Sequence, residues 1–371
     1  MSKLIDELLS KGETLEALKE CVKSKQYFLG LFIWKLKFNQ PDNPDYKELV
    51  SVILQNTGQE IINEIPVETN PLTNPLTKPL TNPLTNPFIR VKLLCNWCST
   101  KELADCWNKM SQGDYTWGRI KVVWEGDVDY YVIINSPPKD AIFDKKRTIL
   151  FRMEPHMCLH PEIWGEWANP DDKEFLKVLR HENGDYNNNE WHLSIPYSVL
   201  QEEKGFYKPT NTLSTILSGK YKDPGQVLRV DFVKFLENKQ LPIHVYGENR
   251  WSYKNYMGSL PLHKKNSGLL QYKYTFNAEN HSIDNYYTEK LIDGILAECL
   301  VFYWGCPNLK DYIDERAYVQ LELSNFEKDY ETIQKAIRED WQTQRLPYIR
   351  EAKKKILNEL QFFPRLEKIL K

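Results

Sequence analysis

Two adjacent charged residues, Glu289 and Lys290, stand at a point of the sequence where a diphosphate could be bound. They precede apolar residues that recur at helical spacing, which predicts a helix from about Thr288 to Cys299. The first turn of a helix carries unpaired amide groups that favour an anion, and Lys290 would add a positive charge. The carboxylate of Glu289 could instead accept hydrogen bonds from ribose hydroxyls. An ordinary solvated helix start would explain the same two residues, so the surrounding sequence has to decide.

The surrounding sequence alternates between predicted strands and predicted helices from residue 88 onwards. Such alternation favours parallel sheets covered by helices. A second unit of this kind begins near Leu213, so we expect two lobes with a cleft between them. The predicted strands are Phe88–Leu94, Ile120–Trp124, Tyr130–Ile134, Arg147–Phe151, Leu213–Leu217, Ile243–Tyr246, Lys273–Asn277 and Leu300–Trp304, with helices near Thr100–Met110 and Val227–Leu236.

The amino-terminal part differs in character from these two lobes. Apolar residues at helical spacing predict helices near the start of the chain and over 46–65. A four-residue repeat with proline at 71, 75, 79, 83 and 87 follows, and it predicts a semi-rigid spacer. The expected domains are a helical extension (1–66), a proline-rich linker (67–87), a first lobe (88–212), a second lobe (213–345) and C-terminal helices that brace the lobes (346–371).

Composition excludes several classes of partner and site. The 49 basic and 51 acidic residues give a formal net charge of -2, which creates no general attraction for nucleic acid or an anionic membrane. No apolar run approaches the roughly 20 residues of a membrane helix and no signal peptide is evident, so we expect a cytoplasmic protein. Cys95 and Cys98 lack a second ligand pair, and Asp127 and Asp129 lack a surrounding donor motif, so no metal is expected.

The segment from 276 to 307 resembles the donor-binding motif of the α-1,3-fucosyltransferase family, glycosyltransferase family 10. The spacing of three short motifs matches without a gap, and Ile243–Gly247 resembles a further strand end of that family. The absence of an anchor makes the chain similar to its soluble bacterial and viral members. The three motifs are Glu279-Asn280, Tyr286-Tyr-Thr-Glu-Lys290 and Tyr303-Trp-Gly-Cys-Pro307.

This resemblance implies a fold, a reaction and a set of site residues. The fold would be GT-B, an α/β arrangement in which two Rossmann-like lobes face a cleft, with the first lobe binding the acceptor and the second binding GDP-fucose. The enzyme would move L-fucose from GDP-β-L-fucose to a hydroxyl of a glycan acceptor with inversion, through an α-1,3 linkage and without a required cofactor. Glu154 would be the catalytic base, with His156 as the alternative base. The implied donor-binding residues are Arg229, Glu279, Asn280, Tyr286, Glu289 and Lys290.

Other interpretations of the sequence stay open at this point. Ala278 replaces an aromatic residue of the family motif, so the same fold could use another nucleotide sugar. A decayed lobe that only binds carbohydrate or protein is a further alternative, although the intact run from Tyr286 to Lys290 argues against decay. The N-terminal helices could mediate oligomerisation or docking to a partner.

Overall fold

The computed structural model describes residues 14–23, 49, 52, 88–185, 190–202, 209–261 and 264–371. The chain divides into two compact units, 1–80 and 81–371. The helix described in the first unit is α2 (Thr14–Lys23), in which Ala17 and Leu18 are buried. Apart from positions 49 and 52, the second predicted helix lies outside the described residues, and so does the repeat between 67 and 87.

The first lobe of the second unit is built on a six-stranded sheet with the order β2-β3-β1-β4-β5-β6. Every neighbouring pair is parallel except β2 and β3. Helix α5 (Thr100–Asn108) follows β1, and a capping box between Ser99 and Glu102 fixes where it begins. The strands are β1 (Ile89–Leu94), β2 (Thr116–Trp117), β3 (Ile120–Val122), β4 (Tyr130–Ile134), β5 (Thr148–Phe151) and β6 (Lys177–Leu179).

The second lobe has an entirely parallel six-stranded sheet with the order β12-β11-β10-β7-β8-β9. Its central strands are buried almost throughout, as expected of a sheet that helices cover. Two of the covering helices connect consecutive strands: α8 (Pro224–Asn238) lies between β7 and β8, and α9 (Glu289–Leu296) lies between β10 and β11. The strands are β7 (Asn211–Leu217), β8 (His244–Gly247), β9 (Tyr256–Gly258), β10 (Tyr272–Ala278), β11 (Leu300–Trp304) and β12 (Tyr318–Gln320).

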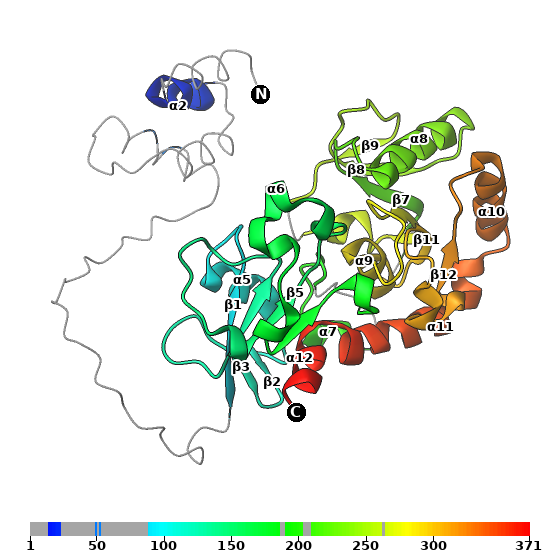
Figure 1. Cartoon of the computed structure of the whole chain (residues 1–371). Coiled ribbons are helices and arrows are strands. Elements are labelled where there is room, and N and C mark those ends of the chain that lie inside the picture. The colour runs from blue at the N-terminus through cyan, green and yellow to red at the C-terminus, as the bar shows by residue number, and fades with distance from the viewer. Residues whose placement is uncertain are drawn as a thin grey trace, which may run out of the picture. The chain divides into compact units, whose positions relative to one another are not determined.

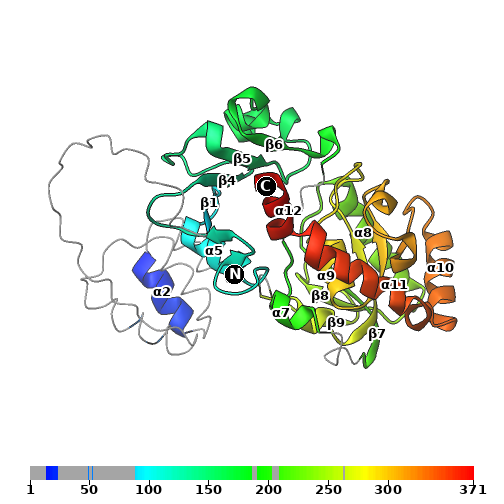
Figure 2. The same cartoon turned by 90° about the horizontal axis from the view of Figure 1, so that it is seen from below.

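The C-terminal helices run from the second lobe to the first (Figures 1 and 2). After α10 (Phe326–Arg338), helix α11 (Trp341–Lys355) packs on α9 and β11, and a π-helical turn, Ile356–Leu360, leads into α12 (Phe362–Leu370). The ring of Phe362 then lies 4.7 Å from the ring of Trp107 on α5. The side chain of Gln361 donates to the carbonyl oxygen of Met110 at 3.2 Å. One continuous stretch of chain therefore touches both sheets.

The prediction of an α/β fold with two lobes is confirmed. The predicted strand Tyr130–Ile134 has the observed bounds, and the predicted strand Leu300–Trp304 does as well. Strands β2, β6, β9 and β12 were not predicted, because elements of two or three residues carry too little alternation to be recognised. The division of the second unit at 212 and 345 stays a prediction.

Candidate functional site

A cavity of about 440 Å³ opens at the carboxyl edge of the second sheet. It lies where the strand order reverses, since β7 has β8 on one side and β10 on the other. Ligands of open α/β sheets bind at such a switch point, outside the carboxyl ends of the strands. The cavity is lined by His192, Ile216, Leu217, Ser218, Lys220, Gln226, Arg229, Gly247, Glu248, Ser259, Leu260, Pro261, Lys265, Asn280, Glu289 and Lys290.

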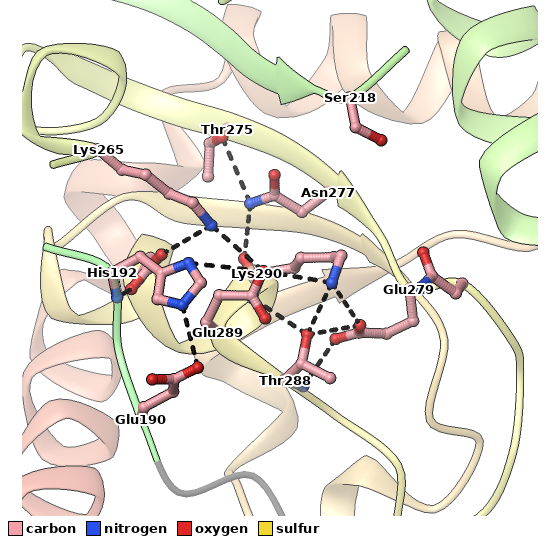
Figure 3. Close-up of polar contacts among 12 residues, drawn as sticks. Glu190, His192, Ser218, Lys265, Thr275, Asn277, Glu279, Thr288, Glu289 and Lys290 are labelled. Carbon is pink, nitrogen blue, oxygen red and sulfur yellow. Dashed lines mark hydrogen bonds and ion pairs between the residues drawn. The ribbon is translucent and has the colours of Figure 1, made fainter. Parts of the chain in front are cut away.

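The first turn of α9 presents Glu289 and Lys290 to this cavity, as Figure 3 shows. Thr288 is the N-cap residue, and its side chain accepts a hydrogen bond from the amide of Lys290. The side chain of Asn277, near the end of β10, donates to the carbonyl oxygen of Lys290 at 2.8 Å. The cap at Thr288 and the bond from Asn277 therefore fix the backbone of this turn, from which the side chains of Glu289 and Lys290 extend.

The buried carboxylate of Glu279 supports this turn from behind. Glu279 is fully buried and accepts hydrogen bonds from the amide and the hydroxyl of Thr288, at 2.8 and 2.7 Å. Lys290 Nζ lies 3.6 Å from Glu279 Oε2. Burial raises the pKa of the Glu279 carboxyl, and the charge of Lys290 opposes that rise. In this arrangement Glu279 holds the residues that face the cavity and does not line the cavity itself.

Glu289 is an ionised carboxylate surrounded by cations. Its Oε1 atom lies 3.3 Å from the ammonium groups of both Lys290 and Lys265, and 4.0 Å from His192 Nδ1. Burial alone would favour the neutral acid, but the charges of Lys290 and Lys265 hold the pKa of Glu289 well below its ordinary value. A charged acceptor thus stands beside two charged donors at one wall of the cavity.

Arg229 contributes a buried guanidinium to the opposite side of the site. It donates to the carbonyl oxygen of Ala278 and the side-chain oxygen of Asn280, both at 3.2 Å, and to the hydroxyl of Ser218 at 3.0 Å. Because Arg229 is 5% exposed, burial lowers its pKa, and the carboxylate of Glu279 opposes this shift. These three bonds fix the guanidinium between the ends of β7 and β10, where its charge reaches the cavity at short range.

Close backbone contact between α8 and β10 brings Arg229 to this place. The amide of Gly225 donates to the carbonyl oxygen of Asn280 at 2.9 Å. A Cβ atom at Gly225 would overlap the carbonyl oxygen of Glu279 and would lie 2.7 Å from the Trp304 ring. Only a residue without a side chain permits this approach.

Gly225→Ala is therefore expected to lower the free energy of unfolding by about 3 kcal/mol or more, because backbone would have to move. Denaturant unfolding of both proteins measures this difference. Gly219→Ala is the matched control, since its Cβ would meet the flexible carboxylate of Glu248, which can turn away. Equal stability of the two variants would contradict the close-packing explanation.

Glu154 lies in the first lobe, in the loop that follows β5. The side chain of Asn135, just after β4, accepts from the amides of Met153 and Glu154 at 2.7 and 3.2 Å. His181 Nε2 lies 3.2 Å from the Glu154 carbonyl oxygen and donates to it. The backbone of Glu154 is thus held by residues that follow β4 and β6, the strands on either side of β5.

The carboxylate of Glu154 is exposed, yet dense protein surrounds it. This loss of water raises its pKa, whereas Lys290 lowers it and Glu289 raises it further. Glu154 therefore lies within electrostatic reach of the α9 turn, although the two belong to different lobes. Arg152 donates to the carbonyl oxygen of Ala168 at 2.7 Å, and burial lowers its pKa while the charge of Glu182 opposes that shift.

Three contacts bring the carboxyl edges of the two sheets together near Glu154. The side chain of Asn285 donates to the carbonyl oxygen of His181 at 2.9 Å. The Tyr286 ring lies 5.4 Å from the His181 ring, and the rings of His156 and His281 are 4.8 Å apart. Tyr286 is 4% exposed and is buried in this contact, so it joins the lobes beside the cavity.

The structure brings the predicted site residues to one region but gives them different positions. Arg229, Asn280, Glu289 and Lys290 line the cavity, Glu279 and Tyr286 are buried beside it, and Glu154, in the other lobe, interacts electrostatically with Lys290 and Glu289. The functions assigned to these residues stay predictions.

Sequence reasoning missed several residues that line the cavity. Ser218, Lys220 and Glu248 directly follow predicted strands, so the rule that ligands bind at carboxyl ends would have found them. Lys265 and His192 come from segments without periodicity, and no sequence signal marks them.

Within the described segments, no helix has both the length and the apolar character needed to cross a membrane. In that same part of the chain, no group of three or more His, Cys, Asp and Glu side chains is placed to hold a metal ion.

Comparison with known proteins yields likeness in fold only. No protein-family model and no curated protein sequence matches the chain. The structure is similar to the crystal structure of an α1,3-fucosyltransferase with GDP, at 16% identity and a TM-score of 0.45, over 77% of this chain and 95% of that one. It is also similar to an α-glucosyltransferase in complex with UDP and a 13-mer DNA, at 11% identity and a TM-score of 0.49, over 76% of this chain and 100% of that one. At such identities the function has to be argued from the residues of the site.

Proposed function

We propose that this protein is an inverting glycosyltransferase that moves L-fucose from GDP-β-L-fucose to a hydroxyl of a glycan. The observation that carries the proposal is the charge arrangement of the cavity at the switch point of the second sheet. The cations Lys220, Arg229, Lys265 and Lys290 outnumber the anions Glu248 and Glu289 among the lining residues. A partly buried cavity with this excess of positive charge suits a diphosphate.

The same cavity has separate features for the other parts of a nucleotide. The carboxylate of Glu289 is ionised and can accept hydrogen bonds from ribose hydroxyls. Apolar side chains of Ile216, Leu260 and Pro261 form a wall that could cover the face of a base. The choice of guanine and fucose rests on the motifs around Glu279, Tyr286 and Lys290, which resemble those of α-1,3-fucosyltransferases.

Transfer would proceed by one displacement at the anomeric carbon. Glu154 would accept the proton of the acceptor hydroxyl while the hydroxyl oxygen forms a bond to the anomeric carbon. At the same time the bond between that carbon and the β-phosphate oxygen would break. GDP would leave with the bonding electrons, and the charges of Arg229 and Lys290 would stabilise it. Attack from the face opposite to GDP would invert the configuration and give an α-linked fucose.

Calorimetric titration of the full chain with GDP-fucose, GDP-mannose and UDP-galactose tests the donor. We expect GDP-fucose to bind most tightly and GDP to compete with it. Preference for GDP-mannose would mean that the protein is a glycosyltransferase that transfers mannose instead of fucose. Such a change of sugar would agree with Ala278, which replaces an aromatic residue of the α-1,3-fucosyltransferase motif. If none of the three nucleotides binds, the proposed function is wrong.

A further inference from the structure

Three nitrogen atoms of basic side chains approach one oxygen of Glu289. Lys290 Nζ, Lys265 Nζ and His192 Nδ1 lie 3.3, 3.3 and 4.0 Å from Oε1. Turning the carboxylate would draw this oxygen away from both ammonium groups, so the two lysines restrict the orientation of Glu289.

Lys265 is the cation of this group that no motif accounts for. Its ammonium lies between two carboxylates one turn apart on α9, 3.3 Å from Glu289 Oε1 and 3.2 Å from Asp293 Oδ2. Asp293 is 1% exposed, and within the described chain its Oδ2 accepts no well-directed hydrogen bond. Two carboxylates at this spacing repel each other, and little water is present to screen them. Lys265 therefore places a positive charge between two carboxylates that repel each other.

The backbone around Lys265 is fixed to the segment that connects β6 to β7. The amide of Lys265 donates to the carbonyl oxygen of His192 at 3.1 Å, and the amide of His192 donates to Asp293 Oδ1 at 2.6 Å. His192 Nε2 also lies 3.2 Å from Glu190 Oε1, and the second oxygen of Glu190 accepts from the Trp107 indole at 2.9 Å. As Figure 3 shows, Lys265 and His192 enclose Glu289 from the side away from Glu279.

We propose that Lys265 is a positioning residue, which holds Glu289 towards the cavity so that its carboxylate accepts hydrogen bonds from the ribose hydroxyls of the nucleotide. This inference rests on the proposed function, because it needs a ribonucleotide in the cavity. It goes further by assigning a role to a residue outside the family motif. Lys265 itself lines the cavity, with 18% of its side chain exposed.

The role of Lys265 is tested by comparing the binding of a nucleotide with and without its ribose hydroxyls to the wild type and to a Lys265 variant. GDP and 2′,3′-dideoxy-GDP are titrated into the wild type and into Lys265→Met, and the ratio of the two dissociation constants is compared. The wild type should prefer GDP by roughly 10- to 100-fold, as hydrogen bonds to a charged acceptor would give. In Lys265→Met the ratio should fall to within about threefold, while dideoxy-GDP still binds through its phosphates. Lys265→Arg should restore most of the preference, because it returns the charge.

The pH dependence of that ratio separates positioning from a general structural role. In the wild type Glu289 stays charged well below its ordinary pKa, so the preference for GDP should persist at pH 5. Without Lys265, one of the charges that lower the pKa of Glu289 is lost, so Glu289 should take up a proton at a higher pH, and the preference should shrink further at pH 5 than at pH 8. The charged groups that act around Glu289 are Lys265, Lys290, His192, Arg229, Glu279, Asp293 and Glu154, with the phenol of Tyr286 nearby.

The outcomes distinguish this inference from the proposed function. Lys264→Met is the control, because Lys264 is exposed and adjacent in sequence, and it should bind both ligands as the wild type does. If Lys265→Met keeps the wild-type ratio at both pH values, the inference is wrong and the proposed function stands. If the wild type does not bind GDP, both are wrong. Should Lys265→Met fail to fold, Lys265→Arg serves as the test. A wild-type ratio of the two dissociation constants in Lys265→Arg supports the role of the charge, and loss of the preference for GDP contradicts it.

Discussion

Glu154→Gln is expected to lower kcat/KM by about 10²- to 10⁴-fold, the range that a positioned general base contributes. Gln has nearly the same shape but cannot accept the proton of the acceptor hydroxyl. The bonds that hold the loop come from Asn135 and His181 to backbone atoms of residues 153 and 154, so the substitution leaves them in place. Donor affinity should therefore stay close to that of the wild type.

The pH profile gives this prediction a second measurement. Loss of surrounding water raises the pKa of Glu154, and the carboxylate is the active form. Activity of the wild type should therefore fall as the pH decreases through a pKa above 4.5, the ordinary value for Glu. The residual activity of Glu154→Gln should lack this acid limb. Glu166→Gln, at an exposed position twelve residues further along the chain, is the control. A fully active Glu154→Gln would assign the base elsewhere, first to His156.

Lys290→Met is expected to reduce turnover by about 10²- to 10³-fold, as removal of one preorganised charge does in other active sites. Lys290 Nζ lies 3.1 Å from the Thr288 hydroxyl and between the carboxylates of Glu289 and Glu279. It is 22% exposed and faces the cavity, so it can meet a phosphate without rearrangement. Donor affinity should fall as well, because the charge of Lys290 would stabilise the diphosphate of the bound donor and also that of the leaving GDP.

The variant also leaves two neighbouring carboxylates with less compensation, so stability must be measured beside activity. Thermal unfolding followed by circular dichroism identifies the temperature range in which Lys290→Met is folded, and kinetics are then measured within it. Lys310→Met removes the same charge from an exposed position and should behave as the wild type. If Lys290→Met is folded and has the kcat and donor affinity of the wild type, Lys290 takes no part in donor binding or transfer.

The strongest sequence signals were those that local physics fixes. The apolar stripe of α9 placed Glu289 and Lys290 in a first helical turn, where the structure has them. Helix α8 begins three residues before the predicted Val227, because the capping box between Asp223 and Gln226 and a proline in the first turn fix its start at Pro224. Central strands were found because buried parallel strands are continuous apolar runs.

Other parts of the site depend on contacts between distant segments, and these leave no local pattern. Lys265 and His192 meet Glu289 only after two irregular segments have packed on α9. Glu279 stands in the family-like motif, but its burial behind Lys290 follows from the packing of β10 against Thr288 and Tyr303. Sequence could thus indicate which residues gather near the site, whereas their separate positions required the structure.

The most direct test of the central claim is a transfer reaction with the full chain. GDP-fucose labelled in the sugar is incubated with glycans that carry free hydroxyls, and the products are separated and their anomeric configuration is read by NMR. We expect an α-linked fucosylated glycan, one GDP released for each fucose transferred, and little product from Glu154→Gln. Formation of a β-linked product, or transfer from UDP-galactose and not from GDP-fucose, would contradict it.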